Sequence, residues 1–314
     1  MGIIKVADIS HVRFTAPDLD VMQAYLKDFG LVPSLEADGI LYARGAGPAP
    51  FLHATAVGEP GFAALGLRAE SLADLETLAA AEGVPVEEFH APGGGKVVRL
   101  RDPDGRLVEV VAGQTLPPPL QLEPEHPRNS ALARPRLRQT VRLGAGPATV
   151  VRLGHCVLEV SDFRTVEAWY KARFGFITSD AIEAAPGLVI GAFMRCDRGD
   201  TPTDHHTLFL LQSPTGPRFN HAAFEVAGID DLMRGHTYLK NARRQAAWGV
   251  GRHLLGSQIF DYWKDPWGHE LEHWTDGDLF VADDGSHTAP LPDLLAVQWG
   301  PLHPMMAGGQ KGAS

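Results

Sequence analysis

The sequence is poor in cysteine, has no long apolar run and carries fewer basic than acidic residues, and each shortage excludes a class of protein. Its 314 residues include two cysteines, Cys156 and Cys196, which form neither a CxxC pair nor a zinc-type spacing. No run of 18 apolar residues occurs, so no membrane-spanning helix is expected. A net charge of −10 would repel nucleic-acid backbones and anionic lipids, so neither nucleic acid nor a membrane is an expected partner.

The first residues, "MGIIKVADISHVRF", lack the apolar core and small-residue cleavage site of a secretion signal. Two cysteines without a disulfide spacing fit a reducing compartment, so we expect a cytoplasmic protein. The composition is 44% hydrophobic and 21% charged, which is typical of a globular protein, and the length allows two domains.

The chain does contain an internal repeat, which sets the expected architecture. The matching segments are residues 9–31 with 153–176, residues 62–75 with 219–232, and residues 102–109 ("DPDGRLVE") with 265–272 ("DPWGHELE"). The distances between successive segments are longer in the second copy, which therefore gained loops.

Within each copy the pattern predicts a strand, a helix and then several strands. "HCVLEV" and "HAAFEV" alternate with period two, as strands do. Asp162 can cap the helix that follows and Gly175 can end it, while Ser71 and Gly83 bracket the corresponding helix of another unit. We therefore predict an α+β fold in which each half consists of two paired βαβββ modules.

Comparison of the two copies singles out one candidate metal site. Three strands of the second half carry ligand-type residues at matching places, namely His155, His221 and Glu272. The first half has His11, Ala64 and Glu109 at these places. Two imidazoles and one carboxylate form the facial triad of non-haem Fe(II) sites, which leaves open positions for substrate and oxygen. The prediction is a metal site in the second half and none in the first.

These observations give expected boundaries. Residues 1–115 form a degenerate, metal-free domain and residues 116–145 a proline-rich, charged linker. Residues 146–290 form the metal-binding domain, and residues 291–314 are a C-terminal tail.

The segment "DYWKDPWGHELEHW" (residues 261–274) reads as a hairpin around its DPWG turn. In such a hairpin Tyr262 falls opposite residues 271 and 272, so a phenol and the Glu272 carboxylate would approach one pocket. A β-bulge would change this pairing.

Five ordered motifs carry a family resemblance: "LGHCVLEV", "DHHTLFL", "FNHAAFEV", "GRHLLGSQIFDYW" and "DPWGHELEHW". With them the sequence resembles the type I extradiol ring-cleavage (catechol 2,3-type) dioxygenases of the vicinal oxygen chelate superfamily. The resemblance covers the second half almost completely and the first half more weakly.

This resemblance implies that His155, His221 and Glu272 bind Fe(II), although these ligand types also allow Mn(II). It implies a vicinal aromatic diol and O2 as substrates, and we expect a homo-oligomer. His206 is the implied acid/base residue, with His205 beside it as a solvated or supporting alternative. His253 is implied to line the catechol pocket, and Tyr262 to hydrogen-bond a substrate oxygen.

One departure from the family bears on the substrate. Some members that accept acidic catechols hold the carboxylate with an arginine, but here Trp248 stands at that position. Phe193 lies on another strand that would face the same cavity. Unless Arg195 or Arg252 reaches the ring, this aromatic wall favours a neutral, apolar ring substituent.

Other interpretations stay open. A histidine on an apolar strand is commonly a packed core residue, and Tyr262 could simply form an aromatic cross-strand pair. The same modules also build glyoxalase-like metal-dependent isomerases or lyases and non-catalytic proteins that bind aromatic compounds. The complete triad in one half, together with "DHHT", favours the ring-opening dioxygenase.

Overall fold

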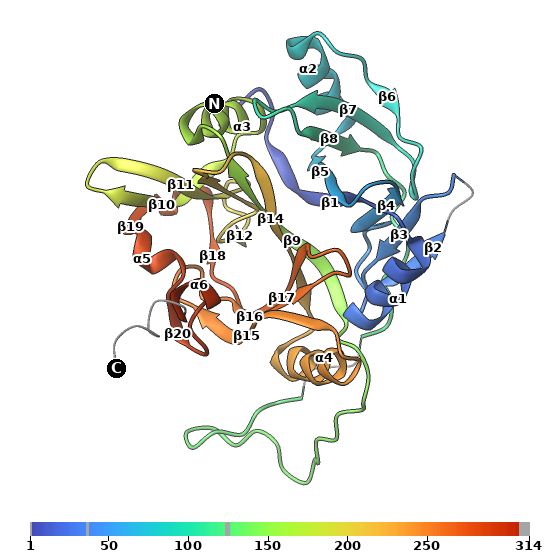
Figure 1. Cartoon of the computed structure of the whole chain (residues 1–314), viewed down its shortest axis with the longest axis vertical. Coiled ribbons are helices and arrows are strands. Elements are labelled where there is room, and N and C mark those ends of the chain that lie inside the picture. Colours follow the sequence, from blue (N-terminus) through green and yellow to red (C-terminus); the bar gives the residue numbers. More distant parts are fainter. Residues whose placement is uncertain (1, 36–37, 123–125, 308–314) are drawn as a thin grey trace.

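The computed structural model describes residues 2–35, 38–122 and 126–307, and two large sheets carry the fold (Figure 1). The first sheet has eight strands in the order β2-β3-β4-β1-β5-β8-β7-β6. Its elements are β1 (Val6–Ala16), α1 (Leu19–Phe29), β2 (Val32–Leu35), β3 (Leu41–Arg44), β4 (His53–Val57), β5 (Gly61–Ala69), α2 (Leu72–Glu82), β6 (Glu87–Glu88), β7 (Lys96–Arg101) and β8 (Leu107–Ala112).

The second sheet has ten strands in the order β19-β10-β11-β13-β9-β14-β17-β16-β15-β20, and β12 and β18 form a small separate pair. Up to the last hairpin its elements are β9 (Val150–Val160), α3 (Phe163–Phe174), β10 (Ile177–Ala185), β11 (Leu188–Arg195), β12 (Thr203–Asp204), β13 (Leu208–Gln212), β14 (Arg218–Val226), α4 (Ile229–Asn241), β15 (Gln245–His253), β16 (Ile259–Lys264) and β17 (Glu270–Thr275). The remaining elements are β18 (Leu279–Phe280), η1 (Ala282–Asp284), β19 (His287–Pro290), α5 (Leu291–Leu294), β20 (Val297–Trp299) and α6 (Pro304–Ala307).

The strand pairing confirms the predicted modules. In the first half β1 runs parallel to β4 and β5 runs parallel to β8, while β1 and β5 are antiparallel neighbours. The second half repeats this arrangement with β9 beside β13, β14 beside β17, and β9 antiparallel to β14. Each half is therefore a pair of βαβββ modules joined at its two central strands.

The helices begin and end where the sequence predicts. The Asp162 side chain accepts a hydrogen bond from the Thr165 backbone N–H at the start of α3, and Ser71 does the same from Asp74 at the start of α2. Gly175 and Gly83 close these helices with φ of 72° and 66°, a left-handed conformation that glycine adopts without strain.

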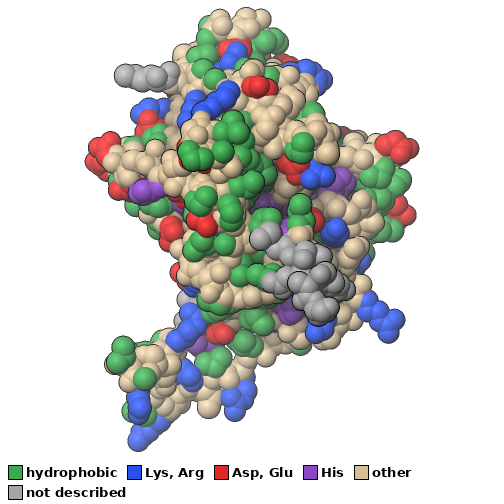
Figure 2. Space-filling view, turned by 60° about the vertical axis from the view of Figure 1, so that its left-hand side comes forward, with side chains coloured by type: hydrophobic (Ala, Val, Ile, Leu, Met, Phe, Trp, Pro, Cys, Tyr) green, Lys and Arg blue, Asp and Glu red, His purple; other side chains and the backbone are tan. Residues whose placement is uncertain are grey.

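Two segments lie outside the repeat. Two strands near the C-terminal end extend both edges of the second sheet, since β19 pairs with β10 and β20 pairs with β15. Between β8 and β9 the described residues contain no helix or strand, and this segment projects beyond α4 (Figure 1). Its Leu132 is 100% exposed, and Arg side chains gather on this projection (Figure 2).

The two halves pack directly on each other. Phe62 and Phe219, which occupy the same place in the two copies, stack with ring centroids 4.7 Å apart. The buried His273 ring lies against Phe29 of the first half, and its Nε2 donates to the Phe29 carbonyl at 2.7 Å. Within the described part of the chain, no helix is both long and apolar enough to cross a membrane.

Candidate metal centre

Three neighbouring strands bring the predicted ligands together. His155 on β9 lies opposite Ala223 of β14, and Glu272 on β17 is paired with the same Ala223 from the other side. His221 stands two residues earlier on β14, so it shares a face with Ala223's position. The candidate ligand atoms of His155, His221 and Glu272 all lie within 4.8 Å of one another.

The geometry and charge of this cluster fit a cation. Oε2 of Glu272 lies 3.3 Å from Nε2 of His155 and 3.3 Å from Nε2 of His221, yet neither Glu272 oxygen has a well-aligned hydrogen-bond partner among the described residues. Glu272 is fully buried, and leaving a buried carboxylate without hydrogen bonds is costly. A cation between the three side chains would compensate this charge.

The protonation states are also those of metal ligands. Burial raises the pKa of Glu272, but contacts with His155, His221 and His253 outweigh burial and hold that pKa well below its usual range. Burial lowers the pKa of His155. An ionised carboxylate and a neutral imidazole with a free nitrogen lone pair are the forms that bind metal.

Tyr262 and His253 lie beside the carboxylate. Tyr262 pairs with Glu272 across the β16–β17 hairpin, as the hairpin argument predicts. Its hydroxyl lies 3.0 Å from Nε2 of His253, which is itself 3.6 Å from Oε1 of Glu272. Burial, followed by the nearby Glu272 charge, raises the pKa of Tyr262 well above its ordinary value, so the phenol keeps its proton.

His206 lies on the other side of the cluster and is backed by two further residues. Its ring centroid is 4.0 Å from that of His155. His206 Nδ1 lies 3.0 Å from Nδ1 of His205, whose Nε2 lies 2.7 Å from Oδ2 of Asp180. Burial, together with His155 and His205, lowers the pKa of His206 well below its usual value. His205 is only 1% exposed, so the solvated alternative for this residue is wrong.

The two residues expected to line the substrate pocket lie near different parts of the site. Trp248 packs against His253 and Tyr262, with ring centroids 5.4 and 5.5 Å away. Phe193 instead contacts His206 edge-on at 4.8 Å and stacks on Phe209 at 4.0 Å.

Neither Arg195 nor Arg252 is available to bind a substrate carboxylate, because the guanidinium group of each already donates to other protein groups. Arg195 is fully buried and donates to the carbonyls of Thr178, Val281, Ala282 and Gly285 and to the Ser179 hydroxyl. Arg252 donates to the Ser257 carbonyl and to Asp276.

Sequence reasoning missed Asp180 and His303. Asp180 lies on β10, far from any recognisable motif, and only the folded sheet brings it to His205. His303 comes from the C-terminal segment, where its ring packs edge-on against Trp248 at 4.6 Å, and the carbonyl of Pro301, two residues earlier, accepts from Trp248 Nε1 at 2.9 Å. No residue pattern in the tail predicts these contacts.

Comparison with known proteins gives a consistent result. Residues 152–273 match the Glyoxalase/Bleomycin resistance protein/Dioxygenase superfamily, so this segment carries a domain of that superfamily. Metapyrocatechase 2 of Cupriavidus necator is 27% identical over 306 residues, covering 94% of this chain and 89% of the relative. An iron-dependent extradiol dioxygenase of Rhodococcus jostii (strain RHA1) is 27% identical over 190 residues, which is 58% of this chain and 56% of that protein.

Solved structures share the fold across nearly the whole chain. A Mn(II)-bound glyoxalase from Novosphingobium aromaticivorans superposes with a TM-score of 0.76 at 24% identity, covering 94% of this chain and 91% of that one. The 2,3-dioxygenase LapB from Pseudomonas sp. KL28 gives a TM-score of 0.76 at 17% identity, covering 93% and 100%. The fold is therefore that of the vicinal oxygen chelate proteins, as the resemblance of the sequence implies.

Proposed function

We propose that this chain, whose second half carries a domain of the Glyoxalase/Bleomycin resistance protein/Dioxygenase superfamily, is an extradiol dioxygenase that opens the ring of a vicinal aromatic diol with O2. The convergence of His155, His221 and Glu272 within one half is the observation that carries this proposal. Relatives named metapyrocatechase and iron-dependent extradiol dioxygenase support it. In this proposal residues 146–290 are the catalytic domain and residues 1–115 a metal-free domain.

The proposed cofactor is Fe(II), held by Nε2 of His155, Nε2 of His221 and the Glu272 carboxylate. Once bound there, ferrous iron supplies coordination of the diol oxygens and electron transfer between the diol and O2. These ligand types also allow Mn(II), which is the alternative ion.

Tyr262 and His253 are proposed to orient the diol. Because Tyr262 keeps its proton, its hydroxyl can donate to a substrate oxygen if His253 Nε2–H donates to the phenol oxygen, 3.0 Å away. Nε2 of His253 also lies 3.6 Å from Oε1 of Glu272, so the imidazole and the phenol both stand beside the carboxylate that would hold the metal.

His206 is proposed to move a proton at the reacting oxygen. Asp180 can only accept a hydrogen bond when ionised, so His205 Nε2–H donates to it. With its proton on Nε2, His205 can accept at Nδ1 from His206 Nδ1–H, which leaves His206 Nε2 free to take a proton from the substrate. The lowered pKa of His206 keeps the imidazole neutral beforehand, and once His206 has taken a proton it readily returns that proton to a product oxygen.

We propose a neutral diol with an apolar ring substituent as the preferred substrate. Trp248 forms an aromatic wall beside His253 and Tyr262, and the guanidinium groups of Arg195 and Arg252 are occupied by other partners. A substrate carboxylate buried at this wall would lack a partner, which is unfavourable.

The test is a substrate panel with the whole chain. The metal-free protein is loaded anaerobically with Fe(II) or, in parallel, with Mn(II), and then mixed in air with 3-methylcatechol, 2,3-dihydroxybiphenyl or a catechol that carries a carboxylate. We expect a yellow ring-opened product with one O2 consumed per diol, and slower turnover of the acidic catechol. Diol binding without O2 uptake would contradict the proposal.

The structural likeness to a Mn(II)-bound glyoxalase supports a metal-dependent isomerase as the second candidate. Isomerisation of a hemithioacetal consumes no O2, so an oxygen electrode separates the two functions. Turnover of methylglyoxal with glutathione, together with no reaction of the diols, would favour this candidate.

A further inference from the structure

A chain of polar contacts leads from His221 to a buried carboxylate that plays no part in the proposed reaction. His221 Nδ1 lies 2.8 Å from Oδ1 of Asn220. Nδ2 of the same Asn220 donates to Oε1 of Glu159 at 2.9 Å. Glu159 lies on β9, is 6% exposed and receives two further hydrogen bonds from Arg218, at 2.7 and 2.8 Å.

Donor and acceptor chemistry allows one arrangement of these contacts. A carboxylate only accepts, so the Asn220 amide must turn its NH2 group towards Glu159 and its oxygen towards His221. An amide oxygen also only accepts, so His221 Nδ1 must carry a proton. In a neutral imidazole this leaves Nε2 bare, and Nε2 is the atom that lies 3.3 Å from Glu272 Oε2.

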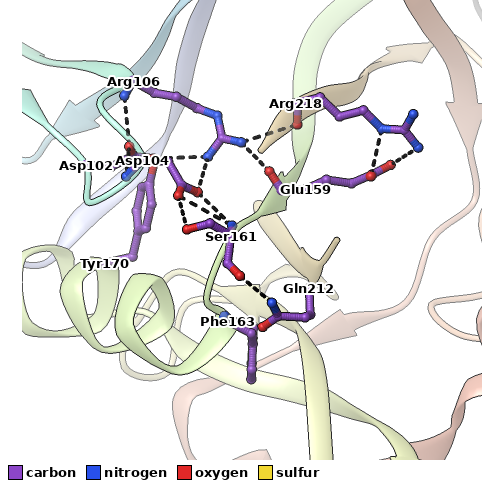
Figure 3. A network of polar contacts seen from close by, with 9 residues as sticks. All are labelled: Asp102, Asp104, Arg106, Glu159, Ser161, Phe163, Tyr170, Gln212 and Arg218. Carbon is purple, nitrogen blue, oxygen red and sulfur yellow. Dashed lines mark hydrogen bonds and ion pairs between the residues drawn. The ribbon is translucent and has the colours of Figure 1, made fainter. Parts of the chain in front are cut away.

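The Glu159 carboxylate is held in its ionised form. Burial alone raises its pKa, but the hydrogen bonds from Arg218 and Asn220 outweigh burial and lower it. The position is also fixed from the first half, because Arg106 donates to the backbone carbonyls of Glu159 and Arg218 (Figure 3). Asp104 of the same turn binds Ser161, two residues beyond Glu159.

The local fold explains how Asn220 reaches both neighbours. On β14 Phe219 lies opposite Leu158 and His221 lies opposite Val157, so Asn220 is the extra residue of a β-bulge. A bulge interrupts the alternation of faces along a strand, and therefore lets adjacent residues act on one side.

The internal repeat provides a control for this interpretation. The bulge is retained in the first half, where Phe62 and Ala64 lie opposite Phe14 and Arg13 and Ala63 is the extra residue. The polar groups are not retained, because Thr15 stands in place of Glu159, and its hydroxyl donates to the Glu59 carbonyl instead. The amide and the carboxylate thus occur only in the half that has the histidine, which a purely structural role of the bulge does not require.

We infer that Glu159 and Asn220 are positioning residues that hold His221 in the tautomer with a bare Nε2, ready to bind a metal. The inference rests on the proposed function only in taking His221 as a metal ligand. Contacts of this kind, made by residues behind a ligand, typically change metal affinity by about 10- to 100-fold.

The direct test reads the tautomer in the metal-free protein. Long-range 1H–15N spectra of histidine-labelled protein distinguish a protonated from a bare ring nitrogen, and the signal lost in His221→Gln identifies His221. We expect the proton on Nδ1 in the natural chain and in Asn220→Asp, which keeps the acceptor, and a mixture of tautomers in Asn220→Leu. An unchanged Nδ1 proton in Asn220→Leu would overturn the inference.

The second readout is the dissociation constant for Mn(II), measured without diol. We expect Asn220→Leu to weaken Mn(II) binding about 10- to 100-fold and Asn220→Asp to weaken it less. Ser161→Ala is the matched control, since Ser161 contacts Asp104 in the same network but neither Asn220 nor His221. The Mn(II) affinity of this variant should be unchanged. Equal losses in all three variants would mean a general structural defect. Neither readout requires O2 chemistry, so a chain that failed as a dioxygenase could still pass this test.

Discussion

The two halves place the same pair of residues, a histidine and a glutamate, at the centre of their sheets, but in opposite electrostatic settings. In the second half the Glu272 carboxylate has no well-aligned donor among the described residues. In the first half Glu109 is fully paired, accepting from Arg13 Nε at 2.6 Å and from Arg99 Nε at 3.0 Å, with His11 Nε2 at 2.8 Å. Two guanidinium groups neutralise Glu109 where a metal would neutralise Glu272.

The positions around the glutamate also differ, because the first half has apolar residues where the second half has histidines. Ala64 pairs with Leu107 where His221 pairs with Glu270, so the first half lacks the second imidazole. Phe51 packs against His11 at 4.7 Å, in the position where His206 packs against His155. The comparison teaches that a buried carboxylate at this place can be compensated by guanidinium groups, so the first half needs no cation at its centre.

Replacing His221 with alanine, the residue at the same place in the first half, should have the largest effect. We expect His221→Ala to abolish O2 consumption, because only two of the three proposed metal ligands remain. Structural Zn(II) contributes about 10–16 kcal/mol over four ligands, so by analogy the loss of one ligand should weaken Mn(II) affinity at most about 100- to 1,000-fold. Isothermal titration measures this.

The reciprocal variant is Ala64→His in the first half. It should create no additional metal site, because Arg13 and Arg99 already bind Glu109. A second equivalent of tightly bound Mn(II) in this variant would show that ligand identity alone distinguishes the halves.

Replacing His206 with phenylalanine, the residue at the same place in the first half (Phe51), tests the proposed acid/base role of His206. We expect His206→Phe to lower kcat by about 100- to 10,000-fold, the usual contribution of a positioned proton donor, while Mn(II) affinity stays within a few-fold. Oxygen-electrode kinetics and metal titration on the same sample separate these effects. An unchanged kcat would assign the proton transfer to His253 or Tyr262 instead.

The repeat explains how much of this could be predicted from sequence. Period-two strands, helix caps and the spacing of His155, His221 and Glu272 are local or periodic features, so the modules and the candidate ligands were predictable. Asp180 was not, because β10 reaches His205 only through sheet order. The pairing of β20 with β15 could not be predicted either. It depends on backbone hydrogen bonds at the edge of the sheet, and no particular residue type marks them in the sequence.

Replacing each of the two glutamates with glutamine removes one negative charge, and the two variants should differ both in their stability without metal and in their response to Mn(II). We expect Glu109→Gln to lower the free energy of unfolding by about 1–3 kcal/mol, because Arg13 and Arg99 lose an anionic partner. Glu272→Gln strands no guanidinium and should cost less in the metal-free protein. Added Mn(II) should raise Tm of the natural chain and of Glu109→Gln but not of Glu272→Gln, because only a protein that binds the ion is stabilised. Differential scanning calorimetry measures both, and an equal Mn(II) response in all three would contradict the assignment of Glu272.

Lowering the pH should gradually remove the stabilisation that the ionised Glu109 carboxylate gives to the first half. Burial raises the pKa of Glu109, but His11 and Arg13 outweigh burial and lower that pKa from its ordinary value of 4.5 to about 2. A carboxylate whose folded pKa is depressed stabilises the protein fully above the unfolded pKa and loses this as pH falls towards the folded pKa. Between pH 4.5 and 3.5 the stability difference between the natural chain and Glu109→Gln should therefore shrink by about 1 kcal/mol.

Urea unfolding followed by two signals can locate this acid effect in the first half. All six tryptophans lie in the second half, between Trp169 and Trp299, so tryptophan fluorescence follows that half and circular dichroism follows both. If the halves unfold separately, only the circular dichroism transition should differ between the natural chain and Glu109→Gln. If they unfold together, both signals should shift equally, because the stacked Phe62 and Phe219 and the Arg106 contacts couple the halves. A pH dependence identical in the natural chain and in Glu109→Gln would mean that Glu109 is not held by its guanidinium partners. The electrostatic difference drawn between the two centres would then be wrong for the first half.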